Sequence, residues 1–142
     1  MIALISCGKK KSRVRCRARD MYQGVYFRKC LEYAELIASE VYIVSEGPGV
    51  TSLDQYLDPY DVTVRDYSKE QLKDWINKVQ GQLRSRGLMG KTVISLVGNQ
   101  HKQALAGLHL IEPLKGKGGM GGKMGYMTRY INSKKSESKG QL

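Results

Sequence analysis

Three short apolar runs, each ending at a glycine-bearing polar loop, constrain the fold of this chain more than any other feature. The runs are IALIS at residues 2–6, VYIVS at 41–45 and TVISLV at 92–97. None of them alternates apolar with polar residues, so each predicts a strand that is buried on both faces of a sheet. Segments with helical spacing lie between the runs. This order predicts a three-layer α/β domain, with a mostly parallel sheet of about four strands and helices on both faces.

Two of the intervening segments predict long helices. Residues 21–38 place apolar side chains near helical spacing. Ser68 and Gln71 have the spacing of a capping box, which predicts a second helix that opens after Ser68 and ends at Gly87. Residues 47–49 are Gly-Pro-Gly, so the second strand should stop there and a turn-rich stretch should follow. The remaining predicted elements are a short helix over 101–107 and a fourth strand at 110–111.

The length of 142 residues fits one domain with a sizeable core. We assign that domain to residues 1–131, with a short helix over 124–131 at its end. Residues 132–142 are polar and nearly free of apolar side chains, so they predict a disordered basic tail.

The net charge of +11 is concentrated at the two ends of the chain. Residues 1–30 hold nine Lys and Arg against one acid, and residues 115–142 hold seven against one, whereas the middle holds eight against eleven. Seven of the basic residues fall among the eleven positions of 9–19. Charge of one sign gathered in two segments favours a polyanionic partner, either nucleic acid or a nucleotide. The alternative is a surface that is charged only for solubility.

Cysteine usage indicates a reduced, cytoplasmic protein. Cys7, Cys16 and Cys30 are odd in number and widely spaced, and they include no CxxC pair. The first apolar run is too short for a signal peptide or a membrane span. A metal site built from these cysteines with His101 and His109 would lack the usual paired ligand spacing, so we expect neither a metal nor another cofactor.

The loops after the three buried strands are expected to meet. Ligands of open α/β sheets bind beyond the carboxyl ends of the strands, where this chain has CGKKK, SEGPG and VGNQH. Gly8 allows a tight turn, and the three lysines that follow can neutralise phosphate oxygens. The pattern is neither a P-loop nor a dinucleotide fingerprint. The candidate phosphate- or nucleic-acid-binding residues are Ser6, Cys7, Gly8, Lys9, Lys10, Lys11, Arg13, Lys115 and Lys117.

Three interpretations of the lysine loop remain open. The lysines can clamp phosphate, or one of them can act as an amine nucleophile or base if neighbouring cations lower its pKa. The third interpretation is a solvated basic loop without a specific role. Lys115 and Lys117 lie in KGKGGMGGK, whose five glycines allow exposed amides to approach a phosphate closely.

Four stretches together resemble a known family. LISCGKKK, YAELIASEVYIVS, DPYDVTV and PLKGKGGMGGKMGYM are similar to segments of small phage and bacterial proteins that typically begin Leu-Ile-Ser-Cys-(Ser/Gly)-Lys-Lys-Lys. That family is distantly similar to the peroxide-stress YaaA proteins, which bind DNA, and to the Cys-Ser-x-x-Lys segment of archaeosine synthase, a tRNA-base-modifying enzyme. The resemblance implies a three-layer α/β domain, an association with nucleic acid or modified bases, and a site centred on the loop after the first strand. The matching positions are Ser6, Cys7, Lys9, Lys10, Lys11, Pro59, Tyr60 and Asp61.

Three acids are candidate catalytic residues, in the order Asp61, Asp58 and Glu46. The other acids that we considered fall on or beside predicted helices. Asp61 lies in a segment that resembles the family, and Glu46 stands where relatives usually carry Ala-Lys and an aromatic residue before glycine. Asp58 begins an Asp-Pro-Tyr sequence that resembles the water-activating motif of uracil-DNA glycosylases, although the partner His-Pro-Ser segment is absent and a simple turn explains it equally well.

Tyr60 and His101 are the candidate walls of a base pocket, and His101 stands where relatives often have tyrosine. Two functions follow from these residues. The first is an enzyme that acts on the N-glycosidic bond or the base of a nucleotide or nucleic acid. The second is a non-catalytic DNA-, RNA- or nucleotide-binding protein, encoded by a phage to interfere with a host system. Neither requires a membrane, and the sequence leaves the substrate and the oligomeric state open.

Overall fold

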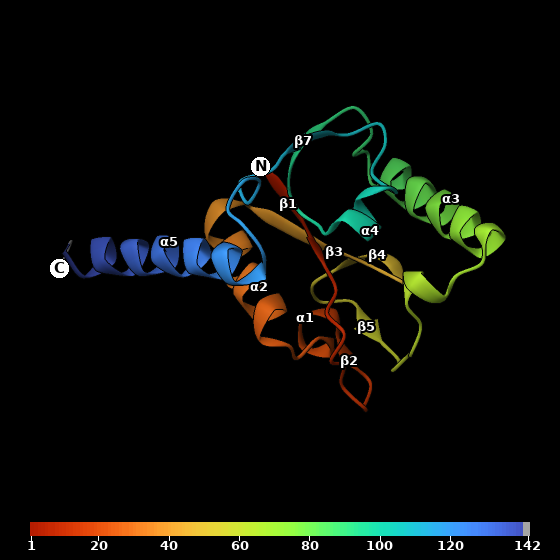
Figure 1. Cartoon of the computed structure of the whole chain (residues 1–142), viewed down its shortest axis with the longest axis horizontal. Coiled ribbons are helices and arrows are strands. Elements are labelled where there is room, and N and C mark those ends of the chain that lie inside the picture. The colour runs from red at the N-terminus through yellow and green to blue at the C-terminus, as the bar shows by residue number, and fades with distance from the viewer. Residues whose placement is uncertain (141–142) are drawn as a thin grey trace.

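The computed structural model describes residues 1–140 and is built around a five-stranded sheet (Figure 1). Its strand order is β4-β3-β1-β6-β7. The strands are β1 (Ile2–Ser6), β3 (Glu40–Ser45), β4 (Gly49–Ser52), β6 (Thr92–Leu96) and β7 (His109–Ile111). β1 pairs in parallel with β3 and β6, and β6 pairs in parallel with β7. The predicted mostly parallel α/β sheet is confirmed, with β4 added to the four predicted strands.

The added strand β4 lies antiparallel to β3. Gly47 and Gly49 have φ angles of 69° and 78°, a left-handed conformation that glycine adopts without steric cost. These two residues reverse the chain directly after Glu46, so that Val50 pairs with Val44. The prediction of irregular structure after the second strand is therefore wrong for residues 49–52, because the turn closes a hairpin.

Helices cover both faces of the sheet, as predicted. α2 (Val25–Ile37) and α5 (Met120–Gly140) lie on one side in Figure 1, and α3 (Lys69–Ser85) lies on the other. Successive side chains of β1 point to opposite faces of the sheet and so enter two separate hydrophobic cores. Ala3 and Ile5 pack with α2 and α5, whereas Leu4 packs with α3. The smaller elements are α1 (Ala18–Met21), α4 (Asn99–Lys102), the 3₁₀ turn η1 (Val64–Asp66), and the antiparallel pair β2 (Cys16–Arg17) and β5 (Tyr56–Leu57).

The start of α3 has the predicted capping box. The Ser68 hydroxyl accepts a hydrogen bond from the Gln71 amide at 3.1 Å, and the Gln71 side chain accepts one from the Ser68 amide at 2.8 Å. The helix ends at Ser85, and Gly87 follows with a φ of 71°. The predicted short helix over 101–107 is confined to α4, which begins two residues earlier and ends at Lys102.

The C-terminal helix α5 is longer than the sequence predicts. A helix was expected over residues 124–131 and disorder from residue 132, whereas α5 begins at Met120 and continues to Gly140. Ile131, near the middle of α5, is buried, and Lys135 Nζ lies 3.5 Å from Glu32 Oε1 on α2. Both residues therefore connect the extended part of α5 to the rest of the domain. Residues 141 and 142 of the predicted tail lie outside the described residues. Along residues 1–140, no helix is both long and apolar enough to cross a lipid bilayer.

Candidate functional site

The loops after β1, β3 and β6 meet at the carboxyl edge of the sheet, as predicted. The Cys7 amide donates a hydrogen bond to the Val44 carbonyl at 3.1 Å, and the Gly98 amide donates one to the Ser6 hydroxyl at 2.9 Å. β3 and β6 flank β1 on opposite sides. The chain therefore reverses its winding direction at β1, which is the position where open α/β sheets usually bind ligands.

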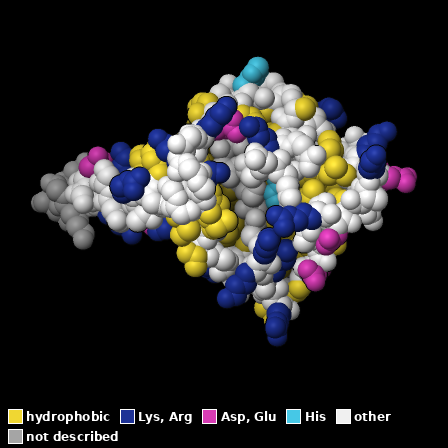
Figure 2. Space-filling view, viewed as in Figure 1, with side chains coloured by type: hydrophobic (Ala, Val, Ile, Leu, Met, Phe, Trp, Pro, Cys, Tyr) yellow, Lys and Arg dark blue, Asp and Glu magenta, His cyan; other side chains and the backbone are white. Residues whose placement is uncertain are grey.

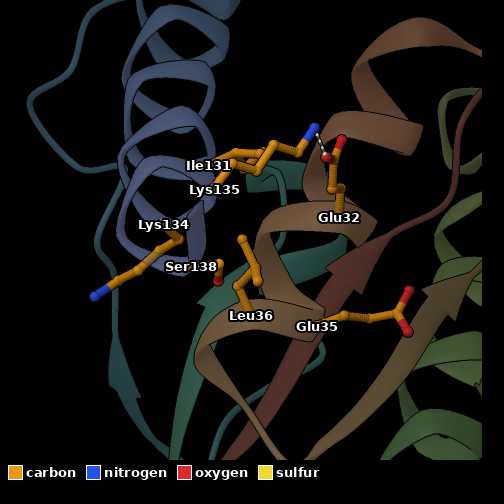
Figure 3. A pocket seen from close by; sticks show the side chains of 7 residues that line it. All are labelled: Glu32, Glu35, Leu36, Ile131, Lys134, Lys135 and Ser138. Atoms are coloured by element: carbon orange, nitrogen blue, oxygen red, sulfur yellow. Dashed lines mark ion pairs between the residues drawn. The ribbon is translucent and has the colours of Figure 1, made fainter. Parts of the chain in front are cut away.

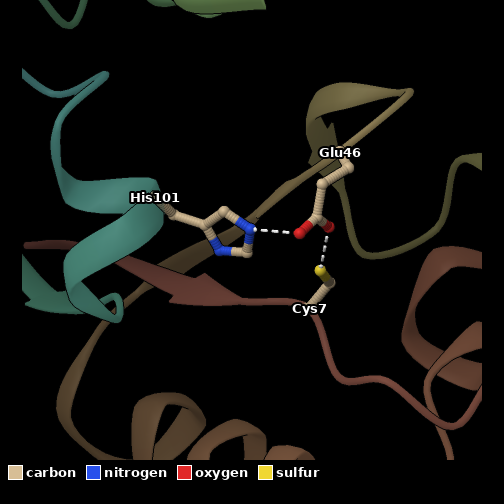
Figure 4. Close-up of side chains that lie close together, drawn as sticks. All are labelled: Cys7, Glu46 and His101. Atoms are coloured by element: carbon tan, nitrogen blue, oxygen red, sulfur yellow. Dashed lines mark hydrogen bonds and ion pairs between the residues drawn. The ribbon is translucent and has the colours of Figure 1, made fainter. Parts of the chain in front are cut away.

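Three side chains at this edge form a hydrogen-bonded cluster (Figure 4). Cys7 and Glu46 directly follow β1 and β3, and His101 lies on α4, which follows β6. One carboxylate oxygen of Glu46, Oε2, accepts a hydrogen bond from Cys7 Sγ at 2.9 Å. The other, Oε1, lies 3.0 Å from His101 Nε2. Glu46 and His101 are each only 7% exposed. We call these three residues, Cys7, Glu46 and His101, the edge cluster.

Surrounding groups fix the orientation of the edge cluster. His101 Nδ1 lies 2.9 Å from the Ser6 hydroxyl oxygen, so both ring nitrogens have a partner. The Val64 amide donates a hydrogen bond to Glu46 Oε1 at 3.3 Å. The Trp75 ring lies against the imidazole, with centroids 5.7 Å apart. The imidazole ring therefore has little freedom to rotate.

The edge cluster holds a buried negative charge. Burial alone would raise the pKa of Glu46, but hydrogen bonds with His101 and Cys7 outweigh this effect and lower the pKa to about 2. Burial raises the pKa of the Cys7 thiol far above its ordinary value, and the negative charge of Glu46 adds to this. At neutral pH, Glu46 is thus a carboxylate and Cys7 a protonated thiol. Cys7 is therefore unsuited to be a free thiolate nucleophile.

The edge cluster can support two kinds of chemistry. Ser6, His101 and Glu46 form a continuous hydroxyl–imidazole–carboxylate chain, which can transfer a proton to or from a group at the sheet edge. The edge cluster also combines a sulfur, a carboxylate oxygen and an imidazole nitrogen, all within 4.8 Å of one another. These are three kinds of donor atom that bind transition metals.

Tyr60 lies beside the edge cluster, whereas its acidic neighbours do not. Its hydroxyl is 2.6 Å from that of buried Tyr22, and its ring contacts the position that a Cβ of Gly47 would occupy, at 3.3 Å. Burial raises the pKa of Tyr22 to about 12, and it raises the pKa of Tyr60 further. Lys11 Nζ lies 5.0 Å from the centroid of the Tyr60 ring. Tyr60 therefore connects the lysine loop to the turn that carries Glu46.

Of the three candidate acids, the structure brings only Glu46 into the edge cluster. The side chain of Asp58 is 81% exposed, and its Oδ1 lies 3.8 Å from Arg15 Nη1. Asp61 is exposed, and no hydrogen bond or ion pair of its side chain is found within residues 1–140. Tyr60 points inward to Tyr22, whereas Asp58 and Asp61 are both exposed to solvent. The predicted order, with Asp61 first, is therefore not supported by the geometry.

The basic segment after β1 is partly neutralised by acids. Arg15 forms an ion pair with Asp58, and Arg19 forms one with Glu35. Arg17 lies within ion-pair distance of both Asp20 and Asp54. Lys9, Lys10 and Arg13 are exposed, and within residues 1–140 no ion pair within 4 Å involves them or Lys11. Figure 2 shows basic side chains gathered on the part of the surface where β2 lies in Figure 1. Within this segment, the unpaired positive charge of the described structure thus lies on Lys9, Lys10, Lys11 and Arg13, in the loop that follows Cys7.

The second basic segment has no described contact with the edge cluster. Lys115 and Lys117 are exposed, and Lys117 Nζ lies 4.7 Å from the centroid of the Tyr126 ring on α5. Gly116 and Gly118 have φ angles of 79° and 89°, so the segment turns sharply before α5 begins. The structure therefore places these two lysines with α5 and not with the loop after β1.

A groove of about 530 Å³ between α2 and α5 is separate from the edge cluster (Figure 3). Glu32 and Lys135 pair across it at 3.5 Å, and Leu36 and Ile131 contribute apolar surface. The groove contains no cysteine or histidine. It lacks the combination of reactive groups found at the sheet edge.

The predictions from the sequence include every member of the edge cluster, but they give the three residues separate roles. Cys7 was grouped with phosphate-binding residues, Glu46 with catalytic acids and His101 with base-pocket residues. Their common position, one to five residues after a buried parallel strand, was the signal that could have joined them. Trp75, which packs on His101 from α3, was not among the predicted site residues.

Comparison with known proteins identifies a family. A family model matches residues 2–129, and it describes a family of unknown function, DUF6884. The match spans the sheet, the edge cluster and the first half of α5. No curated protein matches the chain.

Proposed function

The chain belongs to the family of unknown function DUF6884, and we propose that it is an enzyme that acts on the base or the N-glycosidic bond of a nucleotide or nucleic acid. One observation carries the proposal. A buried, ionised carboxylate, Glu46, lies at the carboxyl edge of the sheet beside a loop with three lysines, for which no acidic partner is found among residues 1–140. A negative group for chemistry and a positive loop for phosphate are thus adjacent.

The lysine loop is proposed to hold the phosphate. Lys9 and Lys10 extend into solvent, while Lys11 is half-buried over the Tyr60 ring. Lysine side chains that neutralise phosphates release counterions from the polyanion, and this release favours binding. Since Tyr60 contacts both Lys11 and the turn after Glu46, a phosphate at this loop would place the attached nucleoside near the edge cluster.

The carboxylate is proposed to carry the chemistry. A negative charge at this position can orient a water molecule or stabilise the positive charge that develops on a sugar when its bond to the base breaks. His101 and Ser6 provide a path for a proton through hydrogen bonds of 3.0 and 2.9 Å. Tyr60 offers an aromatic surface for the base. Glu46 is therefore the proposed catalytic carboxylate, in place of Asp61 and Asp58.

The resemblances of the N-terminal segment support a nucleic-acid substrate. Ser6, Cys7 and the lysines are positions that match the small phage and bacterial proteins, a family that is distantly similar to YaaA proteins and to the archaeosine synthase segment. We extend nucleic-acid association and a phage or bacterial origin to this chain as part of the proposal. Cys7, Cys16 and Cys30 are all free thiols. Free thiols suit a reducing compartment, so we propose a cytoplasmic location.

A second candidate function is non-catalytic binding of DNA, RNA or a nucleotide, for example by a phage protein that interferes with its host. The burial of the edge cluster favours this alternative, because Glu46 and His101 are only 7% exposed and a substrate must reach them. Both candidates use the lysine loop, and they differ only in turnover.

The test is a product search with matched variants. The purified chain is incubated with single- and double-stranded DNA, tRNA and nucleotides, and released bases or altered nucleosides are detected by liquid chromatography and mass spectrometry. We expect a product that disappears in Glu46→Gln, while salt-sensitive binding persists. Binding without any product would support the non-catalytic alternative, and loss of both would contradict the two functions together.

A further inference from the structure

We propose that Cys7, Glu46 and His101 bind a zinc ion. Its binding stands on the geometry of the edge cluster alone, whereas any part that the metal plays in turnover rests on the function proposed above. The inference departs from the sequence expectation, since the three ligands come from segments that follow three different strands and show no paired spacing along the chain.

The three donor atoms are close to the spacing that zinc requires. Bond lengths near 2.3 Å to sulfur and 2.0–2.2 Å to nitrogen or oxygen place tetrahedral ligands roughly 3.4–3.6 Å apart. Cys7 Sγ is 2.9 Å from Glu46 Oε2, and His101 Nε2 is 3.0 Å from Oε1, with all donor atoms within 4.8 Å of one another. To reach the ligand spacing of zinc, the two hydrogen-bonded pairs would lengthen by roughly 0.5 Å. A pair of donor atoms that starts near the upper limit of 4.8 Å would shorten by roughly 1 Å.

The choice of donor atoms favours zinc. A hydrogen-bond role alone does not require sulfur, because a thiol is a weak donor and a hydroxyl would serve better against a carboxylate. Sulfur with imidazole nitrogen suits zinc, whereas magnesium and calcium prefer oxygen ligands. Zinc takes the place of the Cys7 thiol proton, which leaves to solvent, and the sulfur binds as thiolate. Three protein ligands leave a fourth position for water, as in catalytic zinc sites.

The groups around the edge cluster match the support that metal ligands usually have. A histidine that binds zinc with one nitrogen generally hydrogen-bonds through the other, which fixes the ring. His101 directs Nε2 at Glu46, and its Nδ1 lies 2.9 Å from the Ser6 hydroxyl oxygen. Glu46 receives the Val64 amide, and Trp75 packs on the imidazole. The ligands are therefore held in place before any ion arrives.

The direct test is zinc titration of the full chain. Protein freed of metal by a chelator, which is then removed, is titrated with Zn²⁺ in competition with a chromophoric zinc indicator, and bound metal is counted by mass spectrometry. We expect one zinc per chain. Co²⁺ in its place should give a thiolate-to-metal charge-transfer absorption. Wild-type protein that takes up no stoichiometric zinc would overturn the inference.

Matched variants locate the site within the chain. Cys7→Ser and His101→Gln should each weaken zinc binding by about 100-fold or more, since even the loss of an outer partner of a ligand costs 10- to 100-fold. Cys16→Ser and His109→Gln remove the same residue types outside the edge cluster and should bind zinc like the wild type. Circular dichroism of each metal-free variant checks that it is folded. Equal zinc affinity in folded Cys7→Ser and wild-type protein would contradict the inference.

The metal site and the proposed function can fail separately. Replacing Lys9, Lys10 and Lys11 by alanine should weaken phosphate-dependent binding strongly but leave zinc affinity unchanged. Zinc binding without any nucleotide or nucleic-acid chemistry would support the metal site and contradict the proposed enzymatic function. Chemistry at the wild-type rate in zinc-free protein would exclude a role for the metal in turnover. Failure of the wild-type protein to bind zinc would overturn the metal site and leave the proposed enzyme untouched.

Discussion

At the scale of single residues, Glu46 is the group with the most unusual environment. It is a buried acid whose pKa falls to about 2, although burial by itself acts in the opposite direction. Three donors, from Cys7, His101 and the Val64 amide, surround its two oxygens. A charge that is buried and hydrogen-bonded in this way is often functional, because perturbed ionisation concentrates at active sites.

The contact between Tyr22 and Tyr60 yields a prediction about stability. Tyr60→Phe removes one hydroxyl of the 2.6 Å pair and leaves the hydroxyl of fully buried Tyr22 without this partner. The free energy of unfolding should therefore fall by about 1–3 kcal/mol, as measured by urea denaturation. Tyr56→Phe is the control, since Tyr56 is 60% exposed and its loss should change stability little. A Tyr60→Phe protein as stable as the control would argue against this contact.

At the scale of elements, the loop after β1 should account for most of the salt-dependent binding. Replacing Lys9, Lys10 and Lys11 by alanine should reduce the slope of log affinity against log salt by about two to three, roughly one per lost phosphate contact. Fluorescence anisotropy with a labelled oligonucleotide at several salt concentrations measures the slope. Lys69, Lys73 and Lys91, three exposed lysines elsewhere, form a control triple with the same change of charge. An equal reduction in both triples would mean that binding follows net charge alone.

The cap of α3 is an independent test of the fold at this scale. Ser68→Ala removes the acceptor of the Gln71 amide and should destabilise the protein by about 1 kcal/mol. Thermal or urea unfolding measures this, with exposed Ser133→Ala as the control because Ser133 lies within α5. If the two variants had equal stability, the cap would not contribute.

Sequence patterns predicted the elements that follow from local physics. The buried runs, the capping box and the glycine stop of α3 are all local, and all three were found. β4 was missed because the same glycines that end β3 also form a hairpin turn. The extension of α5 was missed because it depends on contact with α2, such as the Lys135–Glu32 pair, which no local pattern reveals.

At the scale of the whole molecule, the topology of the sheet explains why the position of the site could be predicted from the sequence, whereas the ranking of the three candidate acids could not. The rule for parallel sheets predicted that the loops carrying Cys7, Glu46 and His101 would meet. It gave no information on Asp58 and Asp61, whose orientation depends on Tyr60 packing against Tyr22 and on the pairing of β5 with β2. Counting charges along the sequence also overstated the free positive charge of the basic loop. Three of its arginines form ion pairs with acids from other parts of the chain.

The most direct measurement of the central claim compares wild type, Glu46→Gln and Asp61→Asn in one assay. Each protein is incubated with DNA, tRNA and nucleotides, and the rate of base release or nucleoside change is measured by chromatography and mass spectrometry. We expect the rate to fall about 100-fold or more in Glu46→Gln, with binding equal or tighter, and to stay close to wild type in Asp61→Asn. Full activity in folded Glu46→Gln would contradict the claim that this carboxylate carries the chemistry.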